Sequence, residues 1–422
     1  MLRGLADSTF TVMSCNVAGL PAIISSGNPA ANSIELGKRL SRWDIVNMQE
    51  DFNYHAQVYS QNTHPYRTAT SGGVPFGSGL NTMSRFPFNN ITDIDRVKWT
   101  KCNNDEGADC LTPKGFTFLE IQLDDGVTFD LYNLHTDAGI KDADLVARRA
   151  NLDQIGAYIA ANSKDNAVIV MGDTNTRYTR TGDNIASFAS SLGLTDGWVS
   201  KIRNGIPPAA GADALVCDQA AVTNDCEVVD KIMFRGNNHL KFNLESWSNE
   251  NVAFLDSAGK PLSDHFPIAA KFSWSLNPSI RLSNAVGGPH GTQFTDVASA
   301  AAGQTVSSIT IRGADRVDAV SLTVSAPKTV TFTHGGTGGT ASTLTLAKGE
   351  YIKSLEAHWG QKGGRTRIFY LSAVTSTGRS VAAGTKTSES TIVYAPAGFQ
   401  ISGFHGRGGD EVDAIGAIYT KI

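Results

Sequence analysis

Two short stretches, Gly172-Asp173-Thr174-Asn175 and Ser263-Asp264-His265-Phe266-Pro267, decide how the first part of this chain folds. The first follows the apolar run 167–171 and the second precedes the apolar run 268–272, and both runs have the length and composition of buried strands. Each stretch therefore places carboxylate, amide or imidazole groups at a strand end. Metal-assisted phosphoester hydrolysis uses such groups, because a carboxylate orients water and a histidine handles protons or charge.

Four further strand-like runs carry polar residues of the same kinds. They are 12–17, 44–50, 129–135 and 228–234, and they supply Asn16, Glu50, His135 and Asp230 in that order. Taken singly, each residue has an ordinary interpretation, since such groups are common turn formers, surface side chains or packed histidines. The fact that all of these strand ends supply suitable groups favours one shared catalytic site.

This ordered set resembles the endonuclease/exonuclease/phosphatase superfamily, which includes deoxyribonucleases, abasic-site endonucleases, neutral sphingomyelinases and inositol-polyphosphate 5-phosphatases. The resemblance covers about residues 8–274. It implies an α/β (α+β) four-layer sandwich, in which two packed β-sheets are flanked by helices. It also implies a metal-dependent phosphoric ester hydrolase that uses Mg²⁺, with Mn²⁺ as an alternative.

The resemblance further implies roles for the residues that match. Glu50, with Asn16 beside it, is expected to hold the metal ion against a phosphate oxygen, because hard cations prefer oxygen ligands. Asp173 is expected to orient or activate the attacking water. Asn175 is expected to hydrogen-bond the phosphoryl group.

The remaining matches concern protons and charge. His265 is expected to stabilise the transition state, with its ring oriented by Asp230. His135 is expected to contact the phosphate or to protonate the leaving oxygen. Asp264 is expected to support the metal ion or the loop that carries His265.

The motifs leave the substrate open. Residues 110–116, 135–139 and 148–155 are similar to segments of secreted sphingomyelinases, whereas 172–177 and 230–232 resemble inositol-phosphate 5-phosphatases. Arg177 and Lys231 are candidate phosphate-binding residues, with a solvated rim as the alternative. Three functions follow: a phosphoesterase acting on phospholipid or glycan-linked phosphate headgroups, a deoxyribonuclease-like nuclease, and a sugar-binding protein whose hydrolase part is vestigial.

A domain boundary is expected at residues 277–279, which gives domains of 1–276 and 277–422. Beyond it, short alternating strands rich in Thr, Ser and Val are separated by Gly-rich turns, as in an all-β domain. The segments 311–320 and 406–415 are repeats of each other, and 357–365 is a degenerate third copy. Three related sheets of this kind fit a β-prism.

This region, residues 280–422, resembles the jacalin-related lectins. In that family a Gly-rich loop and a Gly-x-x-x-Asp turn bind one sugar, and the matching residues here are Gly287, Gly288, Gly409, Asp410 and Asp413. One principal site at Asp413 for a mannose- or galactose-like sugar is therefore expected. Ala314 replaces the leading Gly before Asp318, and Arg365 stands in place of an acid in the middle copy. A β-prism that binds no sugar is the alternative.

The cysteines indicate an oxidising compartment. Cys102 and Cys110 bracket one polar stretch and Cys217 and Cys226 another, so we expect two local disulfides, with Cys15 as a buried thiol. A zinc site is the alternative, but the chain has no Cys-x-x-Cys motif. Residues 1–7 contain no apolar signal region, so a secreted protein numbered without its signal peptide is expected.

The composition and charge of the chain limit the kinds of molecule that it is expected to bind. The chain is 41% hydrophobic and 18% charged, and no apolar run reaches the roughly 18 residues of a membrane span, so no transmembrane segment is expected. Residues 1–275 carry 23 Lys and Arg against 31 Asp and Glu, a net charge of −8. This charge disfavours general nucleic-acid binding, although a nucleic acid remains a possible substrate. The expected partners are a phosphoester, a sugar, and a membrane-surface or cell-wall glycoconjugate.

Overall fold

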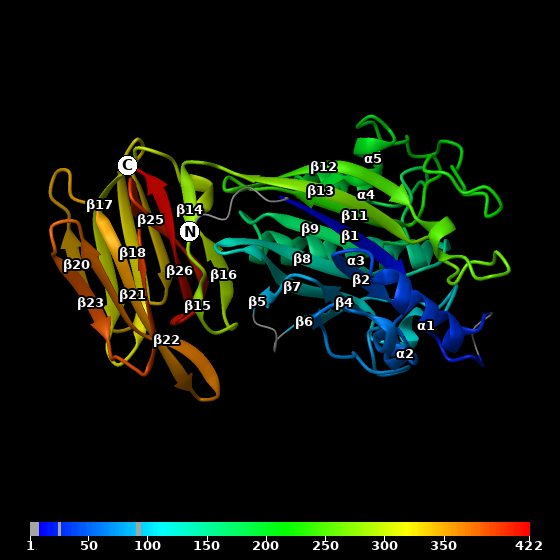
Figure 1. Cartoon of the computed structure of the whole chain (residues 1–422), viewed down its shortest axis with the longest axis horizontal. Helices are drawn as coiled ribbons and strands as arrows, with labels where there is room; N and C mark the ends of the chain where they lie inside the picture. Colours follow the sequence, from blue (N-terminus) through cyan, green and yellow to red (C-terminus); the bar gives the residue numbers. More distant parts are fainter. Residues whose placement is uncertain (1–7, 24–26, 90–93) are drawn as a thin grey trace.

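The computed structural model describes residues 8–23, 27–89 and 94–422, so residues 1–7, on which the signal-peptide interpretation rests, lie outside the described residues. Two parts lie end to end along the long axis of the molecule: an α/β part and an all-β part (Figure 1). No helix among the described residues is long and apolar enough to cross a membrane.

Two mixed sheets form the α/β part. The six-stranded sheet has the order β12 (Leu240–Asn249), β13 (Ile268–Leu276), β1 (Thr9–Asn16), β2 (Ile45–Gln49), β4 (Asn81–Ser84), β3 (Tyr66–Arg67). The other sheet has the order β10 (Thr195–Asp196), β11 (Asp230–Arg235), β9 (Val168–Asp173), β8 (Val127–His135), β7 (Gly115–Asp124), β5 (Phe88–Asn89), with β6 (Asp95–Lys98) also paired to β7.

The helices cover the outer faces of these sheets. They are α1 (Pro29–Leu40), α2 (His55–Gln61), α3 (Asp142–Asn162), α4 (Ile185–Ser191) and α5 (Gly197–Lys201), with short 3-10 turns η1 (Asp109–Leu111) and η2 (Asn251–Phe254). Alternation along β1 shows the layering, since Phe10 packs between the sheets and Met13 packs with Leu36 of α1. Leu152 and Ile155 of α3 pack on the second sheet. The predicted four-layer sandwich is confirmed.

The all-β part contains a four-stranded and a nine-stranded antiparallel sheet around a core of its own. Its strands are β14 (Ile280–Leu282), β15 (Val286–Gly287), β16 (Thr292–Thr295), β17 (Thr305–Gly313), β18 (Val317–Ala326), β19 (Val330–Gly335), β20 (Thr340–Thr345), β21 (Ile352–Lys362), β22 (Arg365–Thr375), β23 (Ser380–Gly384), β24 (Glu389–Tyr394), β25 (Phe399–Gly408) and β26 (Val412–Lys421), with the 3-10 turn η3 (Val297–Ser299). Two of the three expected sheets are continuous, because Ile352 of β21 pairs with Ile401 of β25.

The second part is attached to one end of the sandwich through polar contacts. The backbone N–H of Gly126, in the β7–β8 turn, donates to Asn284 Oδ1 at 2.8 Å. Asn238, in the β11–β12 turn, donates from Nδ2 to the carbonyls of Val297 and Ala300 at 2.9 and 2.7 Å. These turns lie at the opposite ends of the strands from His135, Asp173 and Asp230, so the attached part stands away from the predicted catalytic edge.

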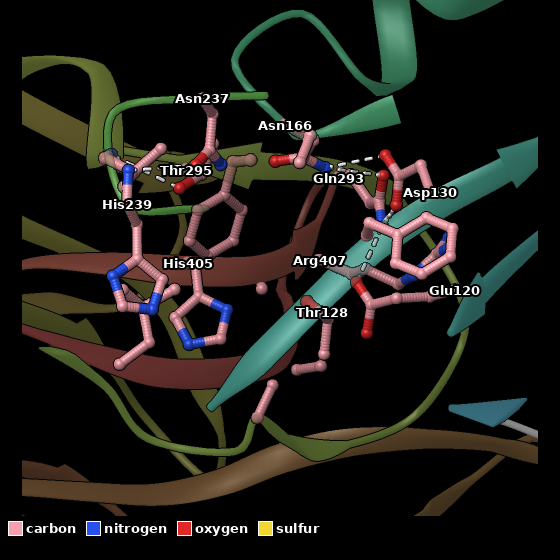
Figure 2. Close-up of a pocket in the computed structure, with 18 of the residues that line it drawn as sticks. Glu120, Thr128, Asp130, Asn166, Asn237, His239, Gln293, Thr295, His405 and Arg407 are labelled. Atoms are coloured by element: carbon pink, nitrogen blue, oxygen red, sulfur yellow. Dashed lines mark hydrogen bonds between the residues drawn. The ribbon is translucent and has the colours of Figure 1, made fainter. Parts of the chain in front are cut away.

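A cavity of about 100 Å³ lies between the two parts. Figure 2 shows Asn166 and Gln293 turned toward Asp130 on its wall, and Asn166 Nδ2 donates to Asp130 Oδ2 at 2.8 Å. Asp130 on β8 lies directly across from Glu120 on β7. Burial and the Glu120 charge raise the pKa of Asp130 to about 7.

The raised pKa predicts a pH dependence of stability. The folded protein holds a proton on Asp130 where the unfolded chain has lost it, so this group makes the unfolding free energy fall between about pH 4 and pH 7. Urea unfolding of wild type and Asp130→Asn at pH 4.5 and 7.5 should show a smaller fall in the variant. Equal falls in the two proteins would contradict the prediction.

Candidate active site

Six strand ends converge at the edge of the sandwich farthest from the all-β part. β8 and β9 run parallel and place His135 beside Asp173. β11 runs antiparallel to β9 and begins there, which pairs Asp230 with Asp173. β1 ends at Asn16, Glu50 follows β2, and His265 lies just before β13. The structure therefore brings together side chains that lie up to about 250 positions apart in the sequence.

Asn16 fixes the position of the Glu50 carboxylate by a hydrogen bond. Asn16 Nδ2 donates to Glu50 Oε1 at 3.0 Å and to Asp173 Oδ2 at 3.2 Å, while Asn16 Oδ1 accepts from the backbone N–H of Ala18. Glu50 has a left-handed backbone with φ of 55°. As placed, Asn16 bridges two carboxylates through its N–H group, and its part in holding a metal ion stays a prediction.

His265 lies between two carboxylates. Its Nδ1 is 3.1 Å from Asp230 Oδ2 and its Nε2 is 3.6 Å from Asp173 Oδ2. Burial acts to lower the pKa of His265, but the charges of Asp173 and Asp230 outweigh burial and raise that pKa well above its ordinary value. The ring is therefore a protonated group near neutral pH, and Asp230 fixes its orientation as expected from the sequence.

His135 is in a different electrostatic state. It is buried, its Nε2 lies 2.9 Å from Lys114 Nζ and 3.3 Å from Asp173 Oδ2, and its buried Nδ1 has no hydrogen-bond partner. Burial, and next the Lys114 and His265 charges, lower the pKa of His135 well below its usual value. A neutral ring suits a hydrogen-bonding role better than the predicted donation of a proton to the leaving oxygen.

Lys114 is a site residue that the sequence-based assignment of roles did not include. It pairs with Asp109 as well as contacting His135, and its side chain is largely buried. The disulfide between Cys102 and Cys110 closes the loop just before it. The signal in the sequence was a lysine immediately before the glycine that starts β7.

Two further predicted residues border this cluster. Asn175 has a left-handed φ of 49°; its backbone N–H donates to Asp173 Oδ1 at 3.0 Å and its Nδ2 donates to the carbonyl of Thr136 at 3.2 Å. Asp264 is exposed next to His265. Asn175 therefore positions Asp173, and Asp264 contributes negative charge at the opening of the site.

The placement of Lys231 contradicts its predicted role in phosphate binding. Successive strand residues face opposite ways, so Lys231 points away from the side of β11 that carries Asp230. It is 3% exposed, and its ammonium donates to the carbonyls of Thr176 and Val228. Arg177 is half-buried and donates to the carbonyl of Glu227. Lys231 and Arg177 thus tie the chain after β9 to the chain before β11.

The site is chemically suited to a divalent cation. Asp173, Asp230 and His265 bring carboxylate oxygens and a ring nitrogen within 4.8 Å of one another, and the carboxylates are the groups that a cation would bind while the ring is protonated. Asp230 Oδ1 is buried without a hydrogen-bond partner, and burial raises the pKa of both Glu50 and Asp173. Three desolvated carboxylates repel one another, and a bound cation would relieve that repulsion. Oxygen donors of this kind fit Mg²⁺ or Mn²⁺.

The remaining cysteines match expectation. Cys217 and Cys226 form the second disulfide, on the loop before β11, and Cys15 is a buried free thiol on β1. Burial raises the pKa of the Cys15 thiol far above its ordinary value, so it is a packing residue.

In the all-β part, the structure brings the Gly287–Gly291 loop to Asp413 as predicted. Gly288 N–H donates to the Asp413 carbonyl at 2.9 Å, and a Cβ on Gly291 would lie 2.5 Å from Asp413 Oδ2. Asp413 is, however, only 3% exposed, and its Oδ1 pairs with Arg367. Gly409 and Asp410 are exposed on the adjoining turn.

A second, equivalent arrangement surrounds Asp318. Gly336 N–H donates to the Asp318 carbonyl at 2.8 Å, and a Cβ on Gly339 would lie 2.5 Å from Asp318 Oδ2. Arg312 holds this loop through the carbonyls of residues 337–339. Asp318 is half-buried. The sequence signal was the run Gly335-Gly336-Thr337-Gly338-Gly339, which the repeat comparison did not include.

The middle repeat has no carboxylate at this place. A Cβ on Gly384 would meet the Phe369 carbonyl at 2.0 Å, just as one on Gly335 would meet that of Asp318. Phe369 therefore occupies the position equivalent to the acid, and the assignment of that position to Arg365 is corrected. The reason is that the β21–β22 hairpin extends further than the other two.

The fold and the strand-end cluster resemble those of the two-sheet sandwich class of phosphoester hydrolases, and the second part is a β-prism of the lectin class. Comparison with protein families agrees: the Endonuclease/Exonuclease/phosphatase family 2 matches residues 30–199, and the Jacalin-like lectin domain matches residues 283–418. The chain thus contains an endonuclease/exonuclease/phosphatase-family domain followed by a jacalin-like lectin domain. The predicted class of protein is confirmed.

Individual relatives match one part or the other. A sphingomyelinase of Mycobacterium tuberculosis is 38% identical over 274 residues, which cover 63% of this chain and 53% of that protein. Horcolin of Hordeum vulgare is 32% identical over 117 residues, covering 27% of this chain and 80% of that protein. A solved structure of Malaysian banana lectin is 29% identical, covers 33% of this chain and 98% of the lectin, and superposes with a TM-score of 0.31. The chain spans about half the length of the sphingomyelinases it matches.

Proposed function

We propose that this protein is a secreted, Mg²⁺-dependent phosphoesterase that hydrolyses phospholipid or glycan-linked phosphate headgroups and is localised by its lectin domain. The observation that carries the proposal is the convergence of Glu50, His135, Asp173, Asp230 and His265 at one edge of the sandwich. The two disulfides support an oxidising compartment, and hence secretion.

Asp173 and His265 have the positions needed for attack by water. Asp173 Oδ2 accepts a hydrogen bond from Asn16, and the backbone of Asn175 fixes its Oδ1, so this carboxylate is oriented to accept a proton from a water molecule. The His265 ring, kept protonated by its two carboxylate neighbours, places positive charge where phosphoryl oxygens gain negative charge.

Lys114 and His135 form the other wall. Lys114 brings a positive charge to Nε2 of His135, and the neutral His135 ring hydrogen-bonds within the site. Glu50, together with the Asp230 carboxylate, whose Oδ1 has no hydrogen-bond partner, would hold the metal ion, whereas the protonated His265 ring has no free lone pair for a cation. When bound, Mg²⁺ neutralises phosphate charge and polarises the phosphoester. The orientation of water by Asp173 and the stabilisation of phosphoryl charge by His265 are carried out by the protein's own side chains.

Two observations favour a lipid headgroup. Loops at the catalytic edge expose large apolar side chains: Ile140, five residues after His135, is 63% exposed, and Leu111, three before Lys114, is 46% exposed. Such side chains suit contact with a lipid surface. The relatives named sphingomyelinase match the same domain.

A nuclease is the second candidate. The observation that favours it is the shared fold, which serves several kinds of phosphoester. The net charge of −8 over residues 1–275 weighs against it, since a polyanion is repelled by an acidic surface. A vestigial hydrolase, the third candidate, does not fit a site in which Asp173 contacts both histidines, Asp230 contacts His265, and Asn16 links Glu50 to Asp173.

The proposal is tested by a panel of substrates in Mg²⁺ buffer: sphingomyelin vesicles, inositol phosphates and plasmid DNA in parallel. We expect hydrolysis of the lipid headgroup and little or none of the DNA. Cleavage of DNA alone would support the nuclease, and no hydrolysis of any substrate would support the vestigial form.

We further propose that the lectin domain binds a mannose- or galactose-like sugar mainly at Asp318. Asp413 must release Arg367 before its Oδ1 can accept from sugar hydroxyls, whereas no side-chain ion pair occupies Asp318 among the described residues. An available carboxylate beside a glycine loop is what a neutral sugar requires.

Isosteric variants test this assignment in the full chain. Asp318→Asn should weaken sugar binding at least tenfold, from an affinity near the millimolar range expected for so few contacts. Asp413→Asn should have a smaller effect. Calorimetric titration with methyl mannoside and methyl galactoside measures both, and an effect confined to Asp413→Asn would restore the assignment made from the sequence. Neither variant should change hydrolysis of a small soluble phosphoester.

A further inference from the structure

The catalytic site is divided between two sheets. Asn16 and Glu50 come from the six-stranded sheet, whereas His135 and Asp173 come from the seven-stranded sheet. Two direct links cross between the sheets at the surface of the site: Asn16 donates to a carboxylate on each side, and His265, just before β13, contacts Asp230 on β11. The geometry of the site therefore depends on how one sheet is positioned over the other.

Most of the contact between these sheets is apolar, as with Phe10, Val12 and Ile45 against Phe129 and Val170. Apolar contacts are non-directional and tolerate small shifts of one layer over the other. Hydrogen bonds are directional, so a few of them between the layers can select one relative position.

Such bonds lie directly behind the site. Gln49 Nε2, on β2, donates to Asn133 Oδ1, on β8, at 2.8 Å. Asn133 Nδ2 donates back to the six-stranded sheet, to the carbonyls of Met48 and Asn81 at 2.9 and 3.2 Å. Gln49 is fully buried and Asn133 is 1% exposed.

The amide bridge formed by Gln49 and Asn133 lies next to catalytic residues in the sequence. Gln49 immediately precedes Glu50, and Asn133 lies two residues before His135, on the same face of its strand. Burying two amides costs free energy unless both are fully bonded, and an apolar pair of the same size would pack at no such cost. The amides therefore contribute a fixed arrangement of the sheets more than they contribute stability.

We propose that Gln49 and Asn133 are positioning residues that set the separation between Glu50 on one sheet and His135 with Asp173 on the other. The proposal rests on the proposed function, because it concerns the metal-binding and catalytic geometry of the same site. Outer residues that orient metal ligands affect metal affinity or activity by 10- to 100-fold, and a misplacement of about 1 Å can cost a similar factor in rate.

The test compares two neighbours on one strand. Asn133→Leu removes the bridge, whereas Tyr132→Phe removes the equally buried hydrogen bond between Tyr132 and Ser163 on the opposite face of β8. We expect Asn133→Leu to weaken Mg²⁺ binding, measured by calorimetry without substrate, by about tenfold and to lower kcat by about 10- to 100-fold with little change in KM. Tyr132→Phe should leave both quantities within about twofold of wild type.

The outcomes separate the proposals. Gln49→Met, which keeps the side-chain shape and removes only the amide, serves in place of Asn133→Leu if that variant does not fold, and the same changes are expected. Unchanged Mg²⁺ affinity and kcat in a folded bridge variant would overturn the positioning role. A wild-type protein that binds Mg²⁺ but hydrolyses nothing would contradict the proposed function alone, because the Mg²⁺ titration still compares the variants.

Discussion

Replacing His265 by Ala should lower the rate of phosphoester hydrolysis by about 10²- to 10⁴-fold, the range for a positioned group that handles protons or transition-state charge. The structure gives the reason, since His265 is the group kept protonated by Asp173 and Asp230 at the heart of the site. Steady-state kinetics on the best substrate of the panel measures the loss.

A second variant separates chemistry from stability. His265→Asn keeps a donor for Asp230 but has no counterpart of Nε2, so it should lose as much activity as His265→Ala. Only the Ala variant leaves Asp230 without that partner, which should lower the unfolding free energy by about 1–3 kcal/mol. His334→Asn in the lectin domain alters a comparable pair with Asp296 and should not affect the rate. A His265→Ala protein retaining more than about a tenth of the wild-type rate would show that this role is wrong.

The acidic residues and histidines of the site could be predicted from the sequence because each is fixed by local placement. A residue that follows an apolar strand lies at the edge of a sheet, and parallel neighbours such as β8 and β9 bring their ends together. The order of these groups along the chain then identified the family. The disulfides were equally local, with separations of eight and nine residues.

The errors arose where a role depended on orientation or on a distant partner. Lys231 follows Asp230 in the sequence, but alternation along β11 turns the two side chains to opposite faces. Arg367 on β22 pairs with Asp413 on β26, and the two residues are 46 positions apart in the sequence. A local sequence pattern cannot predict a contact between residues so far apart. The Gly335–Gly339 loop approaches Asp318 only because β17, β18, β19 and β20 form one sheet. The amide bridge between Gln49 and Asn133 also depends on the packing of whole sheets.

Removal of divalent metal should abolish hydrolysis, and Mg²⁺ or Mn²⁺ should restore it. Beyond activity, the carboxylates of Glu50, Asp173 and Asp230 predict an effect on folding, because they are desolvated and close together and a cation bound only to the folded state stabilises it. Mg²⁺ at about 100 times its dissociation constant should raise the unfolding free energy by about 2.7 kcal/mol. Thermal unfolding in chelator and in a Mg²⁺ series measures the shift.

Glu50→Gln provides the matched variant for this experiment. It keeps the size of the side chain and the hydrogen bond from Asn16 but removes one negative charge from the site. The variant should be at least as stable as wild type in chelator, since repulsion among the buried carboxylates decreases, and it should gain much less stability from Mg²⁺. Asp264→Asn, on the exposed neighbour of His265, should retain most of the Mg²⁺ effect. Hydrolysis that persists in excess chelator, or a Mg²⁺-induced shift of equal size in Glu50→Gln, would contradict a metal ion held by Glu50, because a ligand with a full charge contributes more to binding a divalent cation than its neutral isostere does.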